Sequence, residues 1–436
     1  MKKTFLCFIC TFLIIFSLIT PTLAFNPSAF QITAESAIMA SLDTGDIVYN
    51  KAANTKRYPA SLTKIMTALL ILENTPDLDS EVITVSDYAV NSLLGTGSSV
   101  GGLKIGEKIT ARQMLYYLLM VSANDGAMAV AEHYGTTVEG FVEMMNKKAE
   151  ELGMNNSHFM NPHGLHHEEH YTTAYDVFLL TKAALKYNAF KEAVSSTRYN
   201  MPATNLSDKK LLVTTNMLQD PSTVYFYKYA SGVKTGYTDE AGRCLVSTAE
   251  NDGYSYIVVL MKCPVVDNGR RVRYEFNDSK QLYEWMFNEF DYKSVYETSS
   301  ILGEAKVDLS FENDHVALVP KTSLSAILPK AADLSTVKTE ITLINEVVNA
   351  PVEKGDLLGY AKVSYAGEEL GELELLAADS VEGSVILLVW HYIVLGLKSD
   401  VFKYICIALG SIVAIFVIYV IIINSKRKKK RRRRRY

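Results

Sequence analysis

The sequence predicts an α+β protein, with an antiparallel sheet flanked by helices, then a small all-β domain and a C-terminal transmembrane helix. Residues 37–50 have a two-strand pattern around a turn at residues 43–46, helical patterns follow, and strand patterns return from residue 232. This order is typical of a domain whose sheet is completed by both ends of the segment. Short alternating stretches fill residues 292–383, and residues 404–424 are uncharged.

The N-terminal residues 1–24 have the composition of a secretory signal peptide. Lys2 and Lys3 precede an apolar run from Phe5 to Ile19, and small residues lead to Ala24. We expect cleavage there. An uncleaved anchor helix is the alternative, but the run is short for a bilayer that takes about 20 residues to cross.

The C-terminal part predicts membrane attachment through a single helix. The apolar residues 404–424 are followed by ten consecutive basic residues, Lys426 to Arg435. The positive-inside rule places the basic tail, residues 425–436, in the cytoplasm and residues 25–403 outside the cell membrane. Residues 384–403 begin with an apolar stretch that includes Trp390 and Tyr392, which predicts an interfacial segment.

Charge and cysteine content exclude two classes of protein. Without the ten basic tail residues, the net charge of −4 becomes −14, so we expect no nucleic-acid partner. Five cysteines do not make a disulfide scaffold. Cys244 and Cys263 lie in apolar, strand-like runs of the exported part, and we expect them to be buried free thiols.

The exported residues 25–291 contain the elements of the α+β domain in order. After the first strand pair, Pro59 stands near the first turn of a helix that continues through residues 61–73. Helical patterns recur at residues 111–134, 138–152, 173–187 and 279–290. Strands are expected in VKTGYT, RCLVSTA and YSYIVVLMKC, the last two separated by a turn at residues 251–253.

The sequence Ser61-Leu62-Thr63-Lys64 is the first candidate for chemistry. Residues three apart share one face of a helix, so the amine of Lys64 can reach the hydroxyl of Ser61. A serine becomes a good nucleophile when a base removes its proton, and lysine is such a base when burial or a second cation lowers its pKa. The pattern alone is weak, because a helix N-cap followed by a solvated lysine gives the same letters.

Two further elements make coincidence improbable. Ser122-Ala123-Asn124 follows an amphipathic stretch, and Lys234-Thr235-Gly236 lies in a predicted strand. The first residues of the three elements are separated by 61 and 112 positions. S-x-x-K, S-x-N and K-T-G in this order are the signature of penicillin-binding proteins and related β-lactamases.

On these residues the sequence resembles the D-alanyl-D-alanine carboxypeptidases among the low-molecular-mass penicillin-binding proteins. The resemblance includes YPASLTKIMTA, VSANDGAMAVAEHYG, ELGMNNSHFMNPHGL and GVKTGYTDEAGRCLVSTA and covers most of the exported chain. It implies a β-lactamase/transpeptidase-like catalytic domain followed by an all-β stalk domain. It also implies peptidoglycan stem peptides and β-lactam antibiotics as partners, and no cofactor.

The resemblance implies a role for each motif residue. Ser61 would form an acyl-enzyme with the substrate, Lys64 would take the proton of Ser61, and Ser122 would relay a proton to the departing amine. The substrate-binding residues would be Asn124, Lys234, Thr235, Gly236 and Tyr237, with the backbone N–H groups of Ser61 and Tyr237 forming the oxyanion hole.

One position departs from the family pattern. Some members have an arginine before an asparagine upstream of K-T-G, where it helps to bind the substrate carboxylate, whereas here Thr215 precedes Asn216. Lys228 or Arg243 are candidates for this role, and the sequence does not decide between them.

Two other motifs in the sequence have flanks that do not fit the sites they are typical of. Residues 97–101 match G-x-S-x-G, but a nucleophile elbow needs a strand before it and a helix after it, so we expect a glycine-rich loop at the edge of the groove. Residues 166–170 match H-x-x-E-H, but Pro162 and Gly164 favour a loop. We therefore expect solvated loop histidines and no metal site.

Three alternatives to the carboxypeptidase remain. A β-lactamase needs a carboxylate that activates the deacylating water, and Glu168 and Glu169 are the nearest candidates. A non-catalytic wall-binding protein on the same fold would not be acylated by penicillin. A zinc peptidase would lose activity with a chelator and survive the substitution Ser61→Ala.

Overall fold

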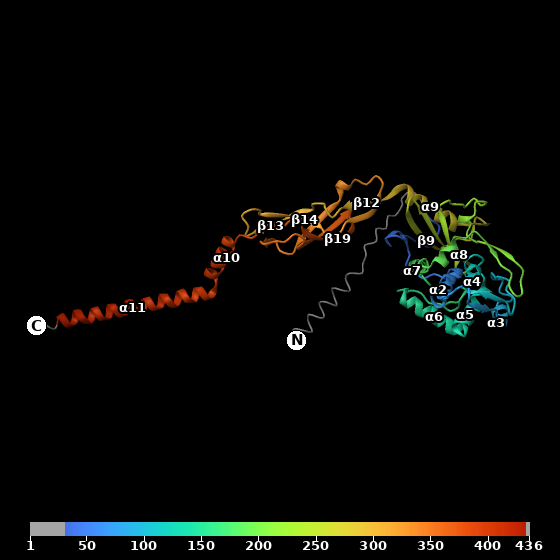
Figure 1. The fold of residues 1–436 in the computed structure, drawn as a ribbon, viewed down its shortest axis with the longest axis horizontal. Helices are drawn as coiled ribbons and strands as arrows, with labels where there is room; N and C mark the ends of the chain where they lie inside the picture. The colour runs from blue at the N-terminus through green and yellow to red at the C-terminus, as the bar shows by residue number, and fades with distance from the viewer. Residues whose placement is uncertain (1–30, 433–436) are drawn as a thin grey trace. The chain divides into compact units, whose positions relative to one another are not determined.

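The structure is a computed structural model that describes residues 31–432 (Figure 1). The predicted signal peptide, residues 1–24, lies outside the described residues. The described chain forms two compact units. The first extends to Asp291 and includes Ile327–Ala332, and the second contains Tyr292–Ala326 and the residues from Asp333 onward.

A five-stranded antiparallel sheet is the framework of the first unit. In sheet order its strands are β2 (Ile47–Lys51), β1 (Ser36–Ser41), β9 (Tyr254–Cys263), β8 (Gly242–Asn251) and β7 (Ala230–Thr238). The first strands of the domain therefore pair with the last ones, as the sequence predicted. Because β7 is an edge strand, one side of its backbone is open to other groups.

Successive side chains of the central strands enter two different hydrophobic cores. Ile38 of β1 packs in the core on the side of α2, α4 and α7, whereas Met39 packs in the core on the side of α9. A strand alternates its side chains between the two faces of a sheet, so a strand covered on both faces is apolar throughout. All six residues of β1 are buried for this reason.

The helices cover both faces of the sheet (Figure 1). Their bounds are α2 (Lys64–Asn74), α3 (Asp87–Asn91), α4 (Ala111–Leu119), α5 (Asn124–Gly135), α6 (Val138–Glu151), α7 (Ala174–Ala184), α8 (Asn188–Ser195) and α9 (Tyr274–Glu289). Residues 64–72 of α2 are all buried, so α2 is the central helix of the domain. The helix α9 begins five residues before the predicted start at Ser279.

The predicted single helical stretch of residues 111–134 is wrong in one respect, because the structure divides it into α4 and α5. The break contains Ser122, whose φ of 60° lies in the left-handed region that a helix cannot contain. Periodicity did not reveal the break, since apolar residues continue on both sides of it.

Short elements complete the first unit. They are η2 (Ala60–Thr63), β3 (Val82–Thr84), β4 (Lys108–Thr110), β5 (Arg198–Met201), β6 (Lys210–Val213), η3 (Met217–Gln219), β10 (Val266–Asp267) and β11 (Arg270–Arg271). Cys244 and Cys263 are buried and free, as predicted.

The second unit contains a six-stranded sheet with its own core. In sheet order the strands are β16 (Lys338–Leu343), β18 (Leu357–Tyr365), β19 (Glu368–Ala377), β14 (His315–Pro320), β13 (Gly303–Asp308) and β17 (Val347–Asn349). The sequence predicted the all-β character but missed the short β17, as well as β12 (Phe290–Tyr296) and β15 (Leu324–Pro329). The small helix η4 (Leu334–Thr336) precedes β16.

The last two described elements are the helices α10 (Val385–Lys398) and α11 (Asp400–Arg432). Residues Asp400–Arg427 of α11 are long and apolar enough to cross a membrane. The predicted span, residues 404–424, lies inside this segment. The predicted interfacial segment, residues 384–403, begins with the helix α10, as the sequence indicated.

Candidate active site

Ser61 lies in a tight turn where the chain enters α2. The turn is the short helix η2, and Ala60, which precedes the serine, has a φ of 47°. It packs closely against β7, because a Cβ on Gly236 would lie 3.2 Å from the Cβ of Ala60 and 3.3 Å from the backbone nitrogen of Ser61. The missing side chain of Gly236 is therefore what lets the edge strand approach the nucleophile turn.

Lys64 lies one helical turn after Ser61 and has no exposed surface. Its Nζ donates to Ser61 Oγ at 3.2 Å, to Asn124 Oδ1 at 2.5 Å and to the backbone oxygen of His163 at 2.7 Å. Burial, and secondly the positive charge of Lys234, hold the pKa of Lys64 well below its ordinary value, although Asp125 opposes the shift. Such a lysine is neutral, and can act as a base, at a lower pH than a lysine exposed to water.

Lys234 is the second buried cation of the site. It is 1% exposed, and its Nζ donates to the backbone oxygen of Thr235 at 3.0 Å. Burial lowers the pKa of Lys234 to about 7. Two lysines with depressed pKa values in one dry region are typical of a catalytic centre rather than of a structural ion pair.

Ser122 lies in the break between α4 and α5, and Asn124 follows directly after the break. Asn124 is the first residue of α5 and accepts the bond from Lys64 with its Oδ1, so its amide NH₂ group remains for another partner. Ser122 Oγ is buried and has no hydrogen-bond partner among the described protein groups. A buried hydroxyl without a partner is costly in a folded protein, so its presence needs an explanation, and a catalytic role is one.

Thr235 lies beside Thr215, the residue at the position where some members of the resembled family have an arginine. The hydroxyls of Thr215 and Thr235 are 2.7 Å apart. Lys228 places its Nζ 4.4 Å from the ring centroid of Tyr229, whereas the Arg243 guanidinium lies 5.2 Å from the ring centroid of Tyr237, a residue of the groove described next.

A groove of about 340 Å³ opens at Ser61. Its lining comes from five parts of the chain: Ser61, Thr96, Gly97, Ser98, Ser99, Asn124, His163, Gly164, Leu165, His166, Tyr237, Thr238, Asp239 and Glu240. The structure therefore brings three predicted site residues, Ser61, Asn124 and Tyr237, to one cavity. The buried Lys64 donates hydrogen bonds to Ser61 and Asn124.

The rim of the groove is fixed by a buried carboxylate. Asp125 accepts hydrogen bonds from the backbone N–H groups of Gly101 at 2.6 Å, Leu103 at 3.0 Å and Gly126 at 2.9 Å. The segment 97–101 is a loop with no strand before it and no helix after it. This confirms the expected glycine-rich loop at the groove's edge, and it connects this loop to the residue after Asn124.

Five histidines lie between His158 and His170, and the expectation that they are solvated loop residues is wrong for two of them. His163 is 8% and His170 is 1% exposed, and burial lowers the pKa of each to about 3. Since Met160 N donates to His170 Nδ1, the Nε2–H of His170 faces Thr63 Oγ1 at 2.8 Å, which in turn donates to Ala60 O. The histidine therefore supports the nucleophile turn. Within residues 31–432 no group of three His, Cys, Asp or Glu side chains is arranged to hold a metal.

Sequence reasoning missed the roles of His163 and His170. The contact of His163 with Lys64 is made by its backbone oxygen, so no residue pattern reveals it. His170 was hidden in a run of exposed neighbours, and only its contact with Thr63, two residues after Ser61, indicates its importance.

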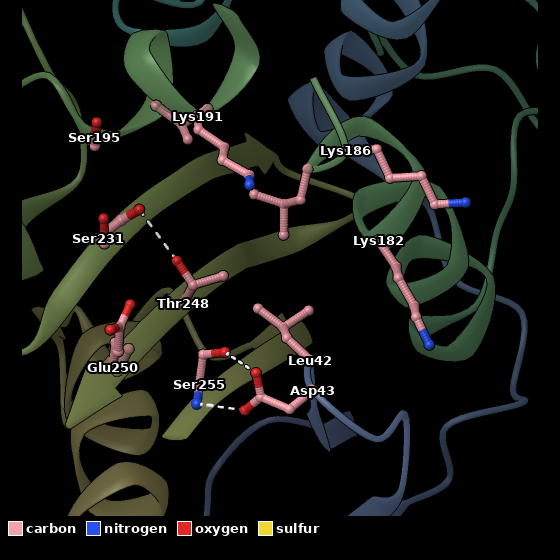
Figure 2. A pocket seen from close by; sticks show the side chains of 13 residues that line it. Leu42, Asp43, Lys182, Lys186, Lys191, Ser195, Ser231, Thr248, Glu250 and Ser255 are labelled. Atoms are coloured by element: carbon pink, nitrogen blue, oxygen red, sulfur yellow. Dashed lines mark hydrogen bonds between the residues drawn. The ribbon is translucent and has the colours of Figure 1, made fainter. Parts of the chain in front are cut away.

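A second cavity, of about 520 Å³, lies beyond the other end of β7 and lacks this chemistry. Figure 2 shows Lys182 of α7 and Lys186, which follows the end of α7, extending away from Ser231 and Thr248. Asp43 is occupied by the backbone N–H and the hydroxyl of Ser255, at 2.9 and 3.0 Å. The greater volume therefore does not make this cavity the active site.

Known proteins resemble the chain over both units. The sequence profile of the D-alanyl-D-alanine carboxypeptidase family matches residues 23–264, and that of the penicillin-binding protein 5 C-terminal domain matches residues 290–383. The D-alanyl-D-alanine carboxypeptidase DacF of Bacillus subtilis is 34% identical over 377 residues, covering 83% of this chain and 92% of the relative.

Solved structures agree with the sequence relatives. The D-alanyl-D-alanine carboxypeptidase DacD of Francisella tularensis is 25% identical, with a TM-score of 0.64 over 84% of this chain and 98% of that one. Penicillin binding protein 5 of Haemophilus influenzae is 25% identical, with a TM-score of 0.61 over 82% of this chain and all of that one. The chain therefore belongs to the D-alanyl-D-alanine carboxypeptidase family and is a serine hydrolase of the penicillin-binding protein fold.

Proposed function

We propose that the protein removes the terminal D-alanine from peptidoglycan stem peptides through an acyl-enzyme on Ser61. The observation that carries this proposal is the contact of Lys64 Nζ with Ser61 Oγ at 3.2 Å in a site where the pKa of Lys64 is strongly lowered. The family supplies the reaction class, and the geometry supports the assignment of roles to this chain's residues.

In the acylation step, neutral Lys64 takes the proton of Ser61 Oγ while that oxygen attacks the carbonyl carbon between the two D-alanines. The backbone N–H groups of Ser61 and Tyr237 stabilise the resulting oxyanion. Such a contact lowers the barrier by about 3 to 4 kcal/mol. The C–N bond then breaks, Ser122 passes a proton to the departing amine, and free D-alanine leaves.

In the deacylation step, water attacks the ester carbonyl and gives its proton to the same base. The C–O bond to Ser61 breaks, the oxygen of Ser61 regains a proton, and the shortened peptide leaves as a carboxylic acid. The two steps sum to hydrolysis of one peptide bond, so the reaction needs no co-reactant besides water.

Substrate binding uses the edge strand and the break between α4 and α5. A peptide can lie along the open side of β7, where Gly236 leaves room beside the nucleophile. The free amide NH₂ of Asn124 can donate to a substrate carbonyl, and Lys234 keeps the surroundings electropositive. Thr235, with Thr215 beside it, is assigned to the terminal carboxylate.

β-Lactam antibiotics are proposed as covalent inhibitors of the same serine. Attack on the lactam carbonyl forms the same ester bond, but the amine that is released stays attached to the acyl group. The departure that completes acylation of a peptide therefore does not occur, and the adduct persists.

We also propose that the catalytic unit lies outside the cell membrane and that α11 anchors it by a single pass. The apolar segment Asp400–Arg427 and the basic residues that follow support this orientation.

The test is intact-mass detection of a penicilloyl adduct, mapped to one peptide, together with release of D-alanine from a D-alanyl-D-alanine peptide. We expect one adduct on the peptide that contains Ser61, D-alanine release, and loss of both in Ser61→Ala. Turnover of nitrocefin faster than D-alanine release would favour the β-lactamase. Absence of both adduct and release would favour the wall-binding protein.

A further inference from the structure

A small pocket next to the catalytic groove contains charged side chains of both signs that do not pair with each other. It has a volume of about 280 Å³ and is lined by Lys56, Arg57, Tyr58, Glu168, Tyr171, Glu240 and Lys262. Glu240 also lines the catalytic groove. The ring of Tyr58 meets that of His166, another groove residue, at a centroid distance of 4.6 Å. The pocket therefore adjoins the groove.

Four of the charges in this pocket have no partner of opposite sign. Arg57 is neutralised by Glu35 at 2.9 Å, outside this set. Among the described ion pairs none contains Glu168, Glu240, Lys56 or Lys262. Lys56 lies over the ring of Tyr171, with its Nζ 4.0 Å from the centroid, and Lys262 Nζ donates to the backbone oxygen of Glu240 at 2.5 Å.

The backbone is arranged to bring Lys262 to this pocket. The register of β8 and β9 shifts between Arg243 and Leu245, which is a β-bulge, and Lys262 has a φ of 58°. A bulge re-aims the side chains of a strand, and a left-handed conformation at a long side chain is maintained only where the surroundings require it.

We infer that this pocket binds the side-chain end of a substrate residue that carries an ammonium and a carboxylate group together. The ammonium would pair with Glu240 and Glu168, and the carboxylate with Lys262 and Lys56. The inference rests on the proposed function, since it assigns the substrate residue that precedes the D-alanyl-D-alanine end. A residue that ends in a lone amine satisfies the glutamates but leaves both lysines without an anion.

The distances along the two chains are compatible. Glu240 is three residues beyond Tyr237, the proposed oxyanion-hole donor, so it lies within about 10 Å of it. A substrate residue next to the penultimate D-alanine has its Cα about 4 Å from that of the alanine, and a long side chain adds roughly 6 Å. Such a side chain can span from the scissile bond to the pocket.

The test compares two peptides that end in D-alanyl-D-alanine and differ only in the preceding residue, L-lysine or meso-diaminopimelate. Partly exposed charge pairs contribute modestly, so we expect kcat/KM to be about 3- to 10-fold higher for the diaminopimelate peptide. Lys262→Gln should bring the ratio of the two kcat/KM values close to one. The matched control Lys147→Gln, an exposed lysine of α6, should leave the ratio as it is in the wild type.

Binding to the Ser61→Ala variant separates this inference from the proposed function. Calorimetric titration of that variant with both peptides needs no turnover, and we expect the diaminopimelate peptide to bind about 3- to 10-fold more tightly. Equal affinities, or a preference that Lys262→Gln does not reduce, overturn the inference even if D-alanine is released. If the Ser61→Ala variant binds the diaminopimelate peptide more tightly but the wild-type protein releases no D-alanine, the pocket is supported and the proposed function is overturned.

Discussion

At the scale of single residues, the chemistry depends on burying two amines in one place. A lysine exposed to water is protonated at neutral pH and cannot take a proton from serine. The complete burial of Lys64 and the charge of Lys234 make its protonation unfavourable, and the hydrogen bonds to Asn124 and His163 keep its amine next to Ser61. The same burial that costs stability thus suits Lys64 to the role of base that we propose for it.

The pKa of Lys64 predicts how acylation depends on pH. The neutral amine is the active form, so the acylation rate should be lost as the pH falls through this lowered pKa and retained above it. The charge of Asp125 raises the pKa of Lys64. Asp125→Asn should therefore move the acid limb of kcat/KM to lower pH.

This shift can be measured from the rate of adduct formation with penicillin between pH 4 and 9. Asp79→Asn is the matched control, because Asp79 is an exposed partner of Arg112. An acid limb at the same pH in Asp125→Asn and in the wild type would contradict the assignment of Lys64 as the base.

At the scale of elements, the active site forms where regular structure stops. Ser61 lies in η2 before α2, Ser122 lies in the break between α4 and α5, and His163 lies in a loop. Ser61 and His163 line the groove, and Ser122 lies two residues before Asn124, which also lines it. Helical periodicity predicted the flanking elements but not the break at Ser122, because the left-handed residue leaves the apolar spacing on both sides unchanged.

The close packing of η2 against β7 predicts the effect of a single methyl group. Gly236→Ala would place a Cβ 3.2 Å from that of Ala60, tighter than ordinary contact, and would push the strand away from Ser61. Since this disturbs the oxyanion hole, we expect kcat/KM to fall by about 10-fold or more while the chain still folds. Acylation kinetics and a thermal unfolding curve measure the two effects, and unchanged kinetics would show that the strand tolerates the methyl group.

At the scale of the whole molecule, the candidate site, the second core and the apolar helix lie in separate parts of the chain. The first unit contains the complete site, and the second has a separate core of small and branched apolar residues. No part of the apolar window of α11 is buried against the rest of the described protein. Such exposure is costly in water and favourable in lipid.

Removal of residues 384–436 should therefore release the protein from membranes without changing its kcat/KM. The measurement is sedimentation with membranes, followed by assay of D-alanine release in the soluble fraction. Continued sedimentation of the shortened chain would show that another part of the molecule also binds lipid.

The sequence by itself determined the fold class, the completion of the main sheet by strands from both ends of the domain, the all-β character of the second unit and the apolar terminal helix. These follow from periodicity and from composition, which are local properties of the chain. The motif residues Ser61, Lys64, Ser122, Asn124 and Lys234 were also evident from the sequence, because their spacing is distinctive.

Only the tertiary structure decided how those residues meet. The burial of His163 and His170, the contact of a backbone oxygen with Lys64, and the pocket formed by Glu168, Glu240 and Lys262 join residues that are distant in the chain. Burial, pKa and pairing depend on which groups surround a side chain in space. No local pattern contains that information, so it appears only once the sheet and the helices have packed together.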